Sequence, residues 1–285
     1  MIHNNHSVLH FASFQNLLSG KNVSFNTIEF VTNEGVATLT LNRPQSLNSF
    51  TTEMHAEIRE VMQQVIDSSD IRCLVITGAG RGFCAGQDLG DRAETDDGDV
   101  PDVGKSVEEN YNPLIQSIMN LPKPVICAVN GVAAGAGASI ALACDIVLAA
   151  RSASFIQIFC KIGLIPDSGG TWNLPRAVGL ARARGLAMLG DRLDAETAET
   201  WGLIWKCIDD DKLQEEAQKM AAYFAVQPTL ALGRIKKLLL ESSSNTLSEQ
   251  LELERQAMQD LGQSEDYREG VHAFLEKRPP VFKGQ

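Results

Sequence analysis

The stretch KPVICAVNGVAAGAGASIALACDIVLAA, residues 123–150, decides how this chain folds. PVICAVNG (124–131) is a continuous apolar run, which predicts a strand buried on both faces of a sheet. The glycine- and alanine-rich segment after it leads into a helix, and IVLAA (146–150) predicts a second buried strand. A strand, a helix and another strand in this order indicate parallel strands joined by a right-handed crossover. The stretch therefore predicts an α/β fold.

Elements of the same kind precede this stretch. VATLTL (36–41) alternates between apolar and polar residues, which predicts a strand. Residues 51–67 carry apolar side chains at helical spacing behind a threonine N-cap. IRCLVITG (71–78) predicts another strand buried on both faces, and a helix is expected over 106–120. From the residues alone, these alternating elements predict one open, doubly wound sheet.

The chain changes character after about residue 172, where a series of amphipathic helical stretches begins. We therefore expect an α/β core over 27–200, a helical region over 201–285 and a flexible extension over 1–26. A helical region with several apolar faces often packs on a neighbouring subunit, so an oligomer is expected. The polar and acidic segment 88–104 predicts a surface loop, and whether that loop covers a site stays open.

Composition narrows the class of partner. The 285 residues carry a net charge of −11, which argues against a nucleic acid or an anionic membrane as partner. No apolar run is long enough to span a bilayer, and the first 25 residues lack the apolar core of a signal peptide. The six cysteines form no CxxC pair and lie mostly in apolar runs, which is typical of free thiols in a reducing compartment. A cytoplasmic location is therefore expected.

The segment GLIPDSGGTW (163–172) invites comparison with the surroundings of a serine-protease nucleophile. Such a serine needs a histidine within hydrogen-bond reach. Of the five histidines, three lie in the expected extension and two on expected helices, and no GxSxG elbow occurs. We therefore interpret the segment as a loop that places the Asp167 carboxylate beside an apolar stretch.

Nucleotide and metal sites are not indicated either. Phe83 stands where a GxGxxG motif needs its third glycine, and no Walker motif occurs. No cluster of His, Cys and carboxylate residues has metal-ligand spacing, so no metal site is expected.

Two glycine-rich loops remain, RGFCAGQDL (81–89) and NGVAAGAGAS (130–139), each of which follows a buried strand. Loops at the carboxyl ends of neighbouring strands can aim two backbone N–H groups at one oxygen, which would form an oxyanion hole. The second loop also opens a helix, whose first N–H groups are free. The equal alternative is that glycine and alanine only allow tight packing of helix against strand.

The motifs LNRPQSLNSF, ITGAGRGFCAGQDL, GLIPDSGGTWNLPR and AFLEKR, together with the stretch 123–150, resemble the crotonase superfamily of enoyl-CoA hydratases and isomerases. The resemblance runs from about Ile28 to Lys283. Within the superfamily, YNPL, IPDSGGTW and SEDYREGVHAFLEKR are similar to the ring-epoxide isomerases of aerobic phenylacetate degradation. The resemblance implies a spiral of ββα units, a C-terminal helical trimerisation region, trimers or hexamers, and an acyl-CoA thioester substrate. It implies no cofactor, since CoA is part of the substrate.

The resemblance also assigns residues. It places the two oxyanion donors at the backbone N–H groups of Gln87 and Ala136. It places Phe274 and Lys277 of the terminal helix at the adenine nucleotide, on the same or an adjacent subunit; for Lys277, a solvated helix-end lysine is an equal alternative. The remaining contacts that it implies with the acyl-CoA are Ser46, Leu47, Ala85, Asp88, Leu89 and Gly135.

The departures from the family pattern concern the two glutamates with which hydratases of this superfamily hold and split water. Ser139 and Phe159 stand at those positions, and neither side chain can act as a base for water near neutral pH. Hydration of a crotonyl-type double bond is therefore not expected. Asp167 remains, and it resembles the acid/base of family isomerases; the alternative is a turn-stabilising aspartate at a helix cap.

The resemblance implies two related reactions through an oxyanion-stabilised enolate. One converts the ring epoxide of phenylacetyl-CoA into the seven-membered oxepin-CoA, and the other moves a 3,4 double bond of an unsaturated acyl-CoA to the 2,3 position. We expect apolar neighbours at 159, 162, 164 and 165 to raise the pKa of Asp167 modestly. Three alternatives stay open: a dehalogenase-like enzyme with Asp167 as nucleophile, a general enoyl-CoA isomerase or hydratase of fatty-acid oxidation, and a non-catalytic acyl-CoA-binding subunit.

Overall fold

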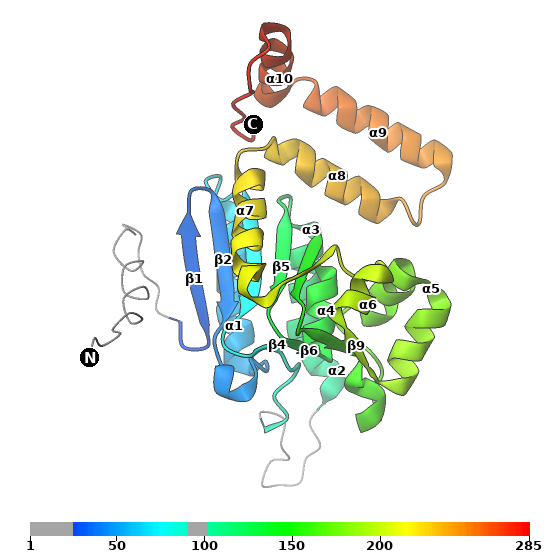
Figure 1. Ribbon diagram of the computed structural model, residues 1–285. Helices are drawn as coiled ribbons and strands as arrows, with labels where there is room; N and C mark the ends of the chain where they lie inside the picture. The colour runs from blue at the N-terminus through cyan, green and yellow to red at the C-terminus, as the bar shows by residue number, and fades with distance from the viewer. Residues whose placement is uncertain (1–24, 91–101) are drawn as a thin grey trace, which may run out of the picture.

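The computed structural model describes residues 25–90 and 102–285 (Figure 1). Residues 1–24 of the expected extension over 1–26, and residues 91–101 of the acidic segment 88–104, lie outside the described residues. The main sheet has six strands in the order β1-β2-β3-β5-β7-β10. Their bounds are Ile28–Asn33, Val36–Leu41, Cys73–Gly78, Val125–Val129, Ile146–Ala150 and Lys206–Ile208. Only β1 pairs in antiparallel fashion, and every residue of β3 and β5 is buried, as the apolar runs predict.

A second, smaller sheet has the order β4-β6-β8-β9. Its strands are Gly82–Cys84, Val132–Ala134, Ser154–Ile156 and Arg192–Asp194. Along the chain β4 follows β3, β6 follows β5 and β8 follows β7, so successive pairs of strands alternate between the two sheets. This alternation confirms the spiral of ββα units, and the single doubly wound sheet expected from the residues alone is wrong.

Gly131 shows why the strand in the apolar run at 124–131 ends at Val129 and a second short strand, β6, begins at Val132. The chain turns between β5 and β6 at Asn130–Gly131, where a Cβ on Gly131 would lie 2.2 Å from the carbonyl oxygen of Arg81. Only glycine allows the two backbones to pass this closely. Hydrophobicity alone does not record such a contact, because it depends on a segment about fifty residues away in the chain.

The helices of the core follow the expected pattern with one exception. Helix α1 (Thr52–Asp67) is capped by Thr51, whose side chain accepts a hydrogen bond from the N–H of Met54. The helix expected over 106–120 is divided into α2 (Val103–Ser106), a π-helical turn η3 (Val107–Tyr111) and α3 (Asn112–Asn120). The other helices of the core are α4 (Ala136–Ala143), α5 (Gly170–Leu189) and α6 (Ala195–Thr200), with short 3-10 turns η1 (Pro44–Ser46), η4 (Ile158–Ile162) and η5 (Asp210–Lys212).

Helix α7 (Leu213–Ala225) packs on β3 and β5 through a buried face, so the sheet and its cover continue past residue 200. Helices α8 (Thr229–Glu241), α9 (Leu247–Leu261) and α10 (Glu265–Glu276) lie at the end of the molecule opposite the small sheet (Figure 1). Arg72 joins the two parts, since its guanidinium donates to Thr229 Oγ1 at 2.7 Å and to the carbonyl oxygen of Phe282 at 3.1 Å. None of the described helices is both long and apolar enough to cross a membrane.

Candidate active site

Three loops leave the same edge of the small sheet. Strands β4, β6 and β8 are neighbours and run parallel, so their carboxyl ends meet at one edge. The loop 85–88 follows β4, the turn at Gly135 follows β6, and the segment 157–169 follows β8. The glycine-rich loops thus directly follow the short strands β4 and β6 of the second sheet. The longer strands β3 and β5 of the main sheet end before these short strands begin.

Glycines bring the first two loops into contact. Gly86 has φ +90°, and a Cβ there would lie 3.0 Å from the Ala134 carbonyl oxygen and 3.4 Å from the Ala136 nitrogen. A Cβ on Gly137 would lie 2.4 Å from the carbonyl oxygen of Cys84, which is impossible without movement of the backbone. The glycines therefore do allow tight packing between the two loops, and this packing also places Gly86, the residue before Gln87, beside Ala136.

The backbone N–H groups of Gln87 and Ala136 are available as donors at this edge. Phe50 donates to the carbonyl oxygen of Gly86 at 2.7 Å and accepts from the N–H of Asp88 at 2.9 Å, so Gln87 N–H points to the other side of its extended segment. Ala136 is the first residue of α4, and the N–H of a first helical residue has no acceptor within its helix. Among the described residues, neither N–H has a hydrogen-bond acceptor.

Asp167 lies in the third loop, in the turn that precedes α5. Its carboxylate oxygen Oδ1 accepts a hydrogen bond from the Ser168 hydroxyl at 3.0 Å, and its carbonyl accepts from the N–H of Gly170 at 2.8 Å. Ser168 and Gly169 both have positive φ, +52° and +76°, which turns the chain sharply into α5. The N-cap of α5 is Gly169, so Asp167 does not occupy the helix-cap position that the alternative interpretation requires.

The Asp167 turn packs against the first turns of α4, the helix that begins with Ala136. A Cβ on Gly170 would lie 2.8 Å from Ser139 Oγ, and a Cβ on Gly135 would lie 3.8 Å from Cζ of the Phe159 ring. Both Ser139 and Phe159 are buried. The structure therefore places a hydroxyl and a phenyl ring, and no second carboxylate, at these two positions between the donor helix and the Asp167 turn.

The expected apolar surroundings of Asp167 form only in part. Phe159 is buried, but Ile162, Leu164 and Ile165 are 52%, 40% and 76% exposed. The prediction that all four side chains desolvate Asp167 is wrong within a single chain, because the turn from η4 to α5 directs three of them outward.

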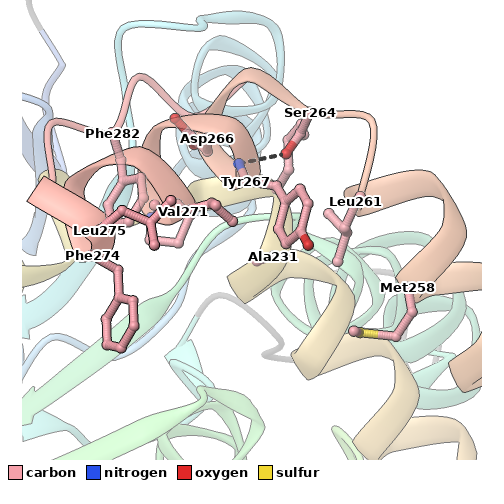
Figure 2. A pocket seen from close by; sticks show the side chains of 14 residues that line it. Ala231, Met258, Leu261, Ser264, Asp266, Tyr267, Val271, Phe274, Leu275 and Phe282 are labelled. Atoms are coloured by element: carbon pink, nitrogen blue, oxygen red, sulfur yellow. Dashed lines mark hydrogen bonds between the residues drawn. The ribbon is translucent and has the colours of Figure 1, made fainter.

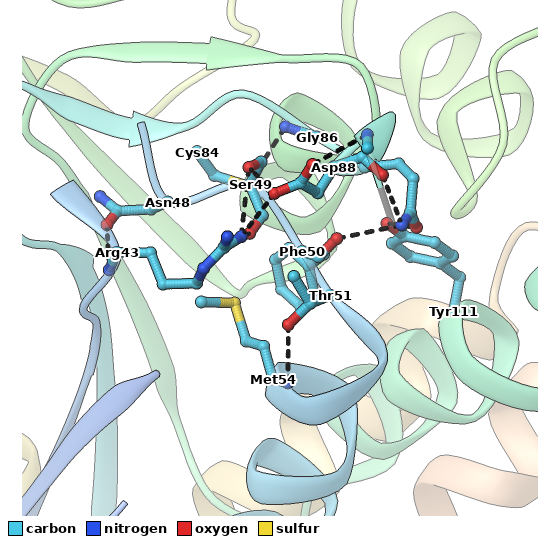
Figure 3. A network of polar contacts seen from close by, with 12 residues as sticks. Arg43, Asn48, Ser49, Phe50, Thr51, Met54, Cys84, Gly86, Asp88 and Tyr111 are labelled. Atoms are coloured by element: carbon cyan, nitrogen blue, oxygen red, sulfur yellow. Dashed lines mark hydrogen bonds and ion pairs between the residues drawn. The ribbon is translucent and has the colours of Figure 1, made fainter. Parts of the chain in front are cut away.

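Most of the residues expected to contact the acyl-CoA lie around the first loop. The Ala85 N–H donates to the Leu47 carbonyl at 2.9 Å, which joins the Ser46–Leu47 segment to the loop. Arg43 forms an ion pair of 2.9 Å with Asp88, and its hydrogen bond lowers the pKa of that carboxyl group (Figure 3). Leu89 is exposed at the end of this loop, and Gly135 lies at the end of β6.

Phe274 and Lys277 are not brought to this site. Phe274 lies in the last turn of α10 and Lys277 directly follows the helix, which is at the opposite end of the molecule from the small sheet (Figure 1). Phe274 is 82% exposed and lines an apolar groove of about 660 Å³ between α8, α9 and α10 (Figure 2). Met258, Tyr267 and Phe282 line the same groove. Within one chain, this groove and the Asp167 turn are separate sites.

Tyr111 is a site residue that the sequence analysis does not assign. Its hydroxyl donates to Gln87 Oε1 at 2.9 Å, and the residue is fully buried at the end of the π-helical turn η3. The only signal in the sequence is the YNPL motif, in which Pro113 marks the start of a helix. The π-helical turn that aims Tyr111 at Gln87 has no comparable sequence pattern.

A two-sheet spiral whose small sheet ends in two glycine-rich loops in close contact is the architecture of a known class of enzymes. The chain belongs to the enoyl-CoA hydratase/isomerase family, whose profile matches residues 31–285. It is 59% identical over 252 residues to the 1,2-epoxyphenylacetyl-CoA isomerase of Escherichia coli, a match that covers 88% of this chain and 96% of the relative. It is 34% identical to the trans-2-decenoyl-[acyl-carrier-protein] isomerase of Streptococcus mutans, which covers 92% of this chain and 100% of the relative.

Solved structures agree with this assignment. An enoyl-CoA hydratase from a Polaromonas species superposes with a TM-score of 0.83 at 37% identity, covering 90% of this chain and 99% of that one. An enoyl-CoA hydratase from Bacillus anthracis superposes with a TM-score of 0.84 at 32% identity, covering 91% of this chain and 100% of that one. The crotonase-type fold expected from the motifs is confirmed.

Proposed function

We propose that the protein is an acyl-CoA isomerase that converts the ring 1,2-epoxide of phenylacetyl-CoA into oxepin-CoA and moves 3,4 double bonds of unsaturated acyl-CoA to the 2,3 position. One observation carries the proposal: the Asp167 turn packs on the helix that begins with the Ala136 donor, while Ser139 and Phe159 stand beside it without a carboxylate. The 59% identity to the Escherichia coli isomerase supports the choice of substrate.

In the proposed reaction, the thioester oxygen accepts hydrogen bonds from Gln87 N–H and Ala136 N–H. Asp167 removes a proton from C2, and the electron pair moves onto that oxygen as an enolate. Each donor of this kind contributes about 10²–10³ in rate by stabilising the developing charge. No cofactor is needed, because the same carboxylate takes up the proton and gives it back.

The return of the proton completes each isomerisation. With a 3-enoyl chain, the enolate is conjugated with the double bond, and Asp167 returns the proton to C4, which leaves a 2,3 double bond. With the ring epoxide, the bond between the two epoxide carbons opens to form the seven-membered ring, and the proton returns to a ring carbon. Both steps conserve atoms and electrons, as an isomerase requires.

The proposal includes a homo-trimer or hexamer, in which α8–α10 meet neighbouring copies. Large apolar side chains on these helices are exposed in the single chain: Leu239, Leu247, Met258, Phe274 and Leu275. Because α10 lies at the opposite end of the molecule from the small sheet whose loops carry Gln87 and Ala136, Phe274 and Lys277 can serve the adenine nucleotide of this site only from another subunit. The proposed location is the cytoplasm, which suits six free cysteines.

The experiment supplies the ring-epoxide acyl-CoA and a 3-enoyl-CoA side by side and follows products by mass and absorbance. The proposal predicts oxepin-CoA and 2-enoyl-CoA, each with the mass of its substrate. Release of a substituent from an aromatic acyl-CoA, with a trapped aspartyl adduct, would instead favour the dehalogenase-like alternative. Binding without turnover of any acyl-CoA would leave only the non-catalytic alternative.

A further inference from the structure

The side chain of Gln87 is held at both ends of its amide group. Its Oε1 accepts from the Tyr111 hydroxyl at 2.9 Å, and its Nε2 donates to the carbonyl oxygens of Phe50 at 3.0 Å and Asp88 at 3.2 Å. In Figure 3 the Tyr111 ring stands beside Phe50 and the loop that carries Gly86 and Asp88. The Gln87 amide therefore links the loop 85–88 to Tyr111 at the end of the π-helical turn η3.

Tyr111 is itself a fixed point. Its ring is fully buried and makes an edge contact with the His55 ring, with 4.5 Å between centroids, and a tilted contact with Phe50 at 5.9 Å. It is the last residue of the π-helical turn η3. Such turns are rare in proteins as a whole, but many of those that occur lie at functional sites. The ring contacts with His55 and Phe50, together with the π-helical backbone, therefore fix the position of the hydroxyl that donates to Gln87.

Backbone hydrogen bonds to Phe50 flank Gln87 on both sides, because Phe50 also accepts from the N–H of Asp88 at 2.9 Å, but only one of them involves the peptide group that carries the donor. The peptide group between Gly86 and Gln87 carries the donor N–H, and its carbonyl accepts from Phe50 N–H at 2.7 Å. Gly86, with φ +90°, adds no side chain that would restrict rotation of this peptide group. The Gln87 side chain is a further anchor, and the Tyr111 hydroxyl holds that side chain by donating to its Oε1.

We propose that Tyr111 is a positioning residue, which fixes the direction of the Gln87 backbone N–H toward the thioester oxygen. The inference rests on the proposed function, because it assumes that a thioester oxygen accepts from this N–H. Tyr111 acts through Gln87 and does not touch the acyl group. Its removal should weaken polarisation of the carbonyl while leaving recognition of the CoA moiety intact.

The test measures the C=O stretching frequency of a saturated acyl-CoA, labelled with ¹³C at the carbonyl, bound to the full-length enzyme. Wild type should shift this band to lower frequency, since two donors polarise the bond. Tyr111→Phe should lose a large part of the shift and lower kcat about 10-fold with KM changed less than about 3-fold, a fraction of the loss of a whole donor. Tyr223→Phe, which makes the same change at an exposed position, should behave as wild type.

A second variant, Gln87→Met, removes the amide and keeps the backbone N–H. If both residues act through the same contact, the double variant Tyr111→Phe with Gln87→Met should be no slower than Gln87→Met alone. A wild-type shift that persists in Tyr111→Phe with unchanged kcat overturns the inference and leaves the proposed function standing. No shift in wild type overturns the proposed oxyanion hole itself, and the inference falls with it.

Discussion

Gly86 and Ala136 approach so closely that a Cβ on Gly86 would lie 3.4 Å from the Ala136 nitrogen. This contact aligns two loops that are fifty residues apart in the chain. It joins the extended segment that carries Gln87 to the start of α4, and in the proposed function it lets the two N–H groups share one oxygen.

Gly86→Ala tests this contact. The methyl group meets the Ala134 carbonyl oxygen at 3.0 Å and forces a residue with a side chain to φ +90°. We expect a loss of about 1–3 kcal/mol in the free energy of unfolding. We also expect kcat to fall further than in a control variant with the same backbone strain. Gly202→Ala is the matched control, because φ is +77° there and the nearest atom is 3.9 Å away. Urea unfolding and steady-state rates measure both effects. Equal losses of kcat in the two variants would contradict the role of the close approach.

Hydration of crotonyl-CoA should be slow. Ser139 and Phe159 cannot take a proton from water, so we expect hydration to be at least about 100-fold slower than isomerisation, the lower end of what general acid–base catalysis contributes. Absorbance of the conjugated thioester measures hydration, and a 3-enoyl-CoA of equal length measures isomerisation. Comparable rates would show that another group activates water in this site.

The Arg43–Asp88 ion pair should appear in the acid stability of the protein. The pKa of Asp88 in the folded protein is lowered, chiefly by the hydrogen bond from Arg43. The ion pair therefore stabilises the fold fully above the ordinary aspartate pKa of about 3.9. That contribution is lost as pH falls through the lower folded-state value. Asp88→Asn should therefore reduce the slope of unfolding free energy against pH below about 4. Urea unfolding between pH 3 and 6 provides the measurement, and identical slopes for the two proteins would refute it.

The buried thiols should resist alkylation. Burial raises the pKa of Cys73 and of Cys84 to about 12, and the thiolate is the reactive form. We expect neither residue to react with iodoacetamide at pH 8 in the native protein, whereas all six cysteines should react in urea. Peptide mass mapping identifies the labelled residues. Rapid labelling of Cys84 in the folded enzyme would mean that the loop it precedes opens often.

The fold could be predicted from the sequence where one residue pattern decides one element. The apolar run at 71–78 predicts β3, and the helical spacing with a threonine cap predicts α1. The break at Gly131 could not be predicted, because it depends on contact with a distant segment, and the π-helical turn before α3 has no comparable sequence pattern. The second sheet was therefore missed by the residues alone and supplied by the family resemblance.

The candidate site divides in the same way. The glycine-rich loops indicated a possible oxyanion hole, and the family resemblance assigned its donors to Gln87 and Ala136 and showed that Ser139 and Phe159 replace two glutamates. The outward direction of Ile162, Leu164 and Ile165 could not be read, since these residues look like core in a linear apolar stretch. The contact of Tyr111 with the site could not be predicted, because it is a hydrogen bond between the Tyr111 and Gln87 side chains, which lie on different segments of the chain.

The central claim is that one carboxylate carries the proton between two carbons. The most direct measurement is turnover by Asp167→Asn on a 3-enoyl-CoA, together with its affinity for a saturated acyl-CoA by calorimetry. We predict that kcat falls about 10²–10⁴-fold, the range for loss of a general base, while the Kd changes less than about 3-fold. Turnover retained near the wild-type rate in Asp167→Asn would contradict the account.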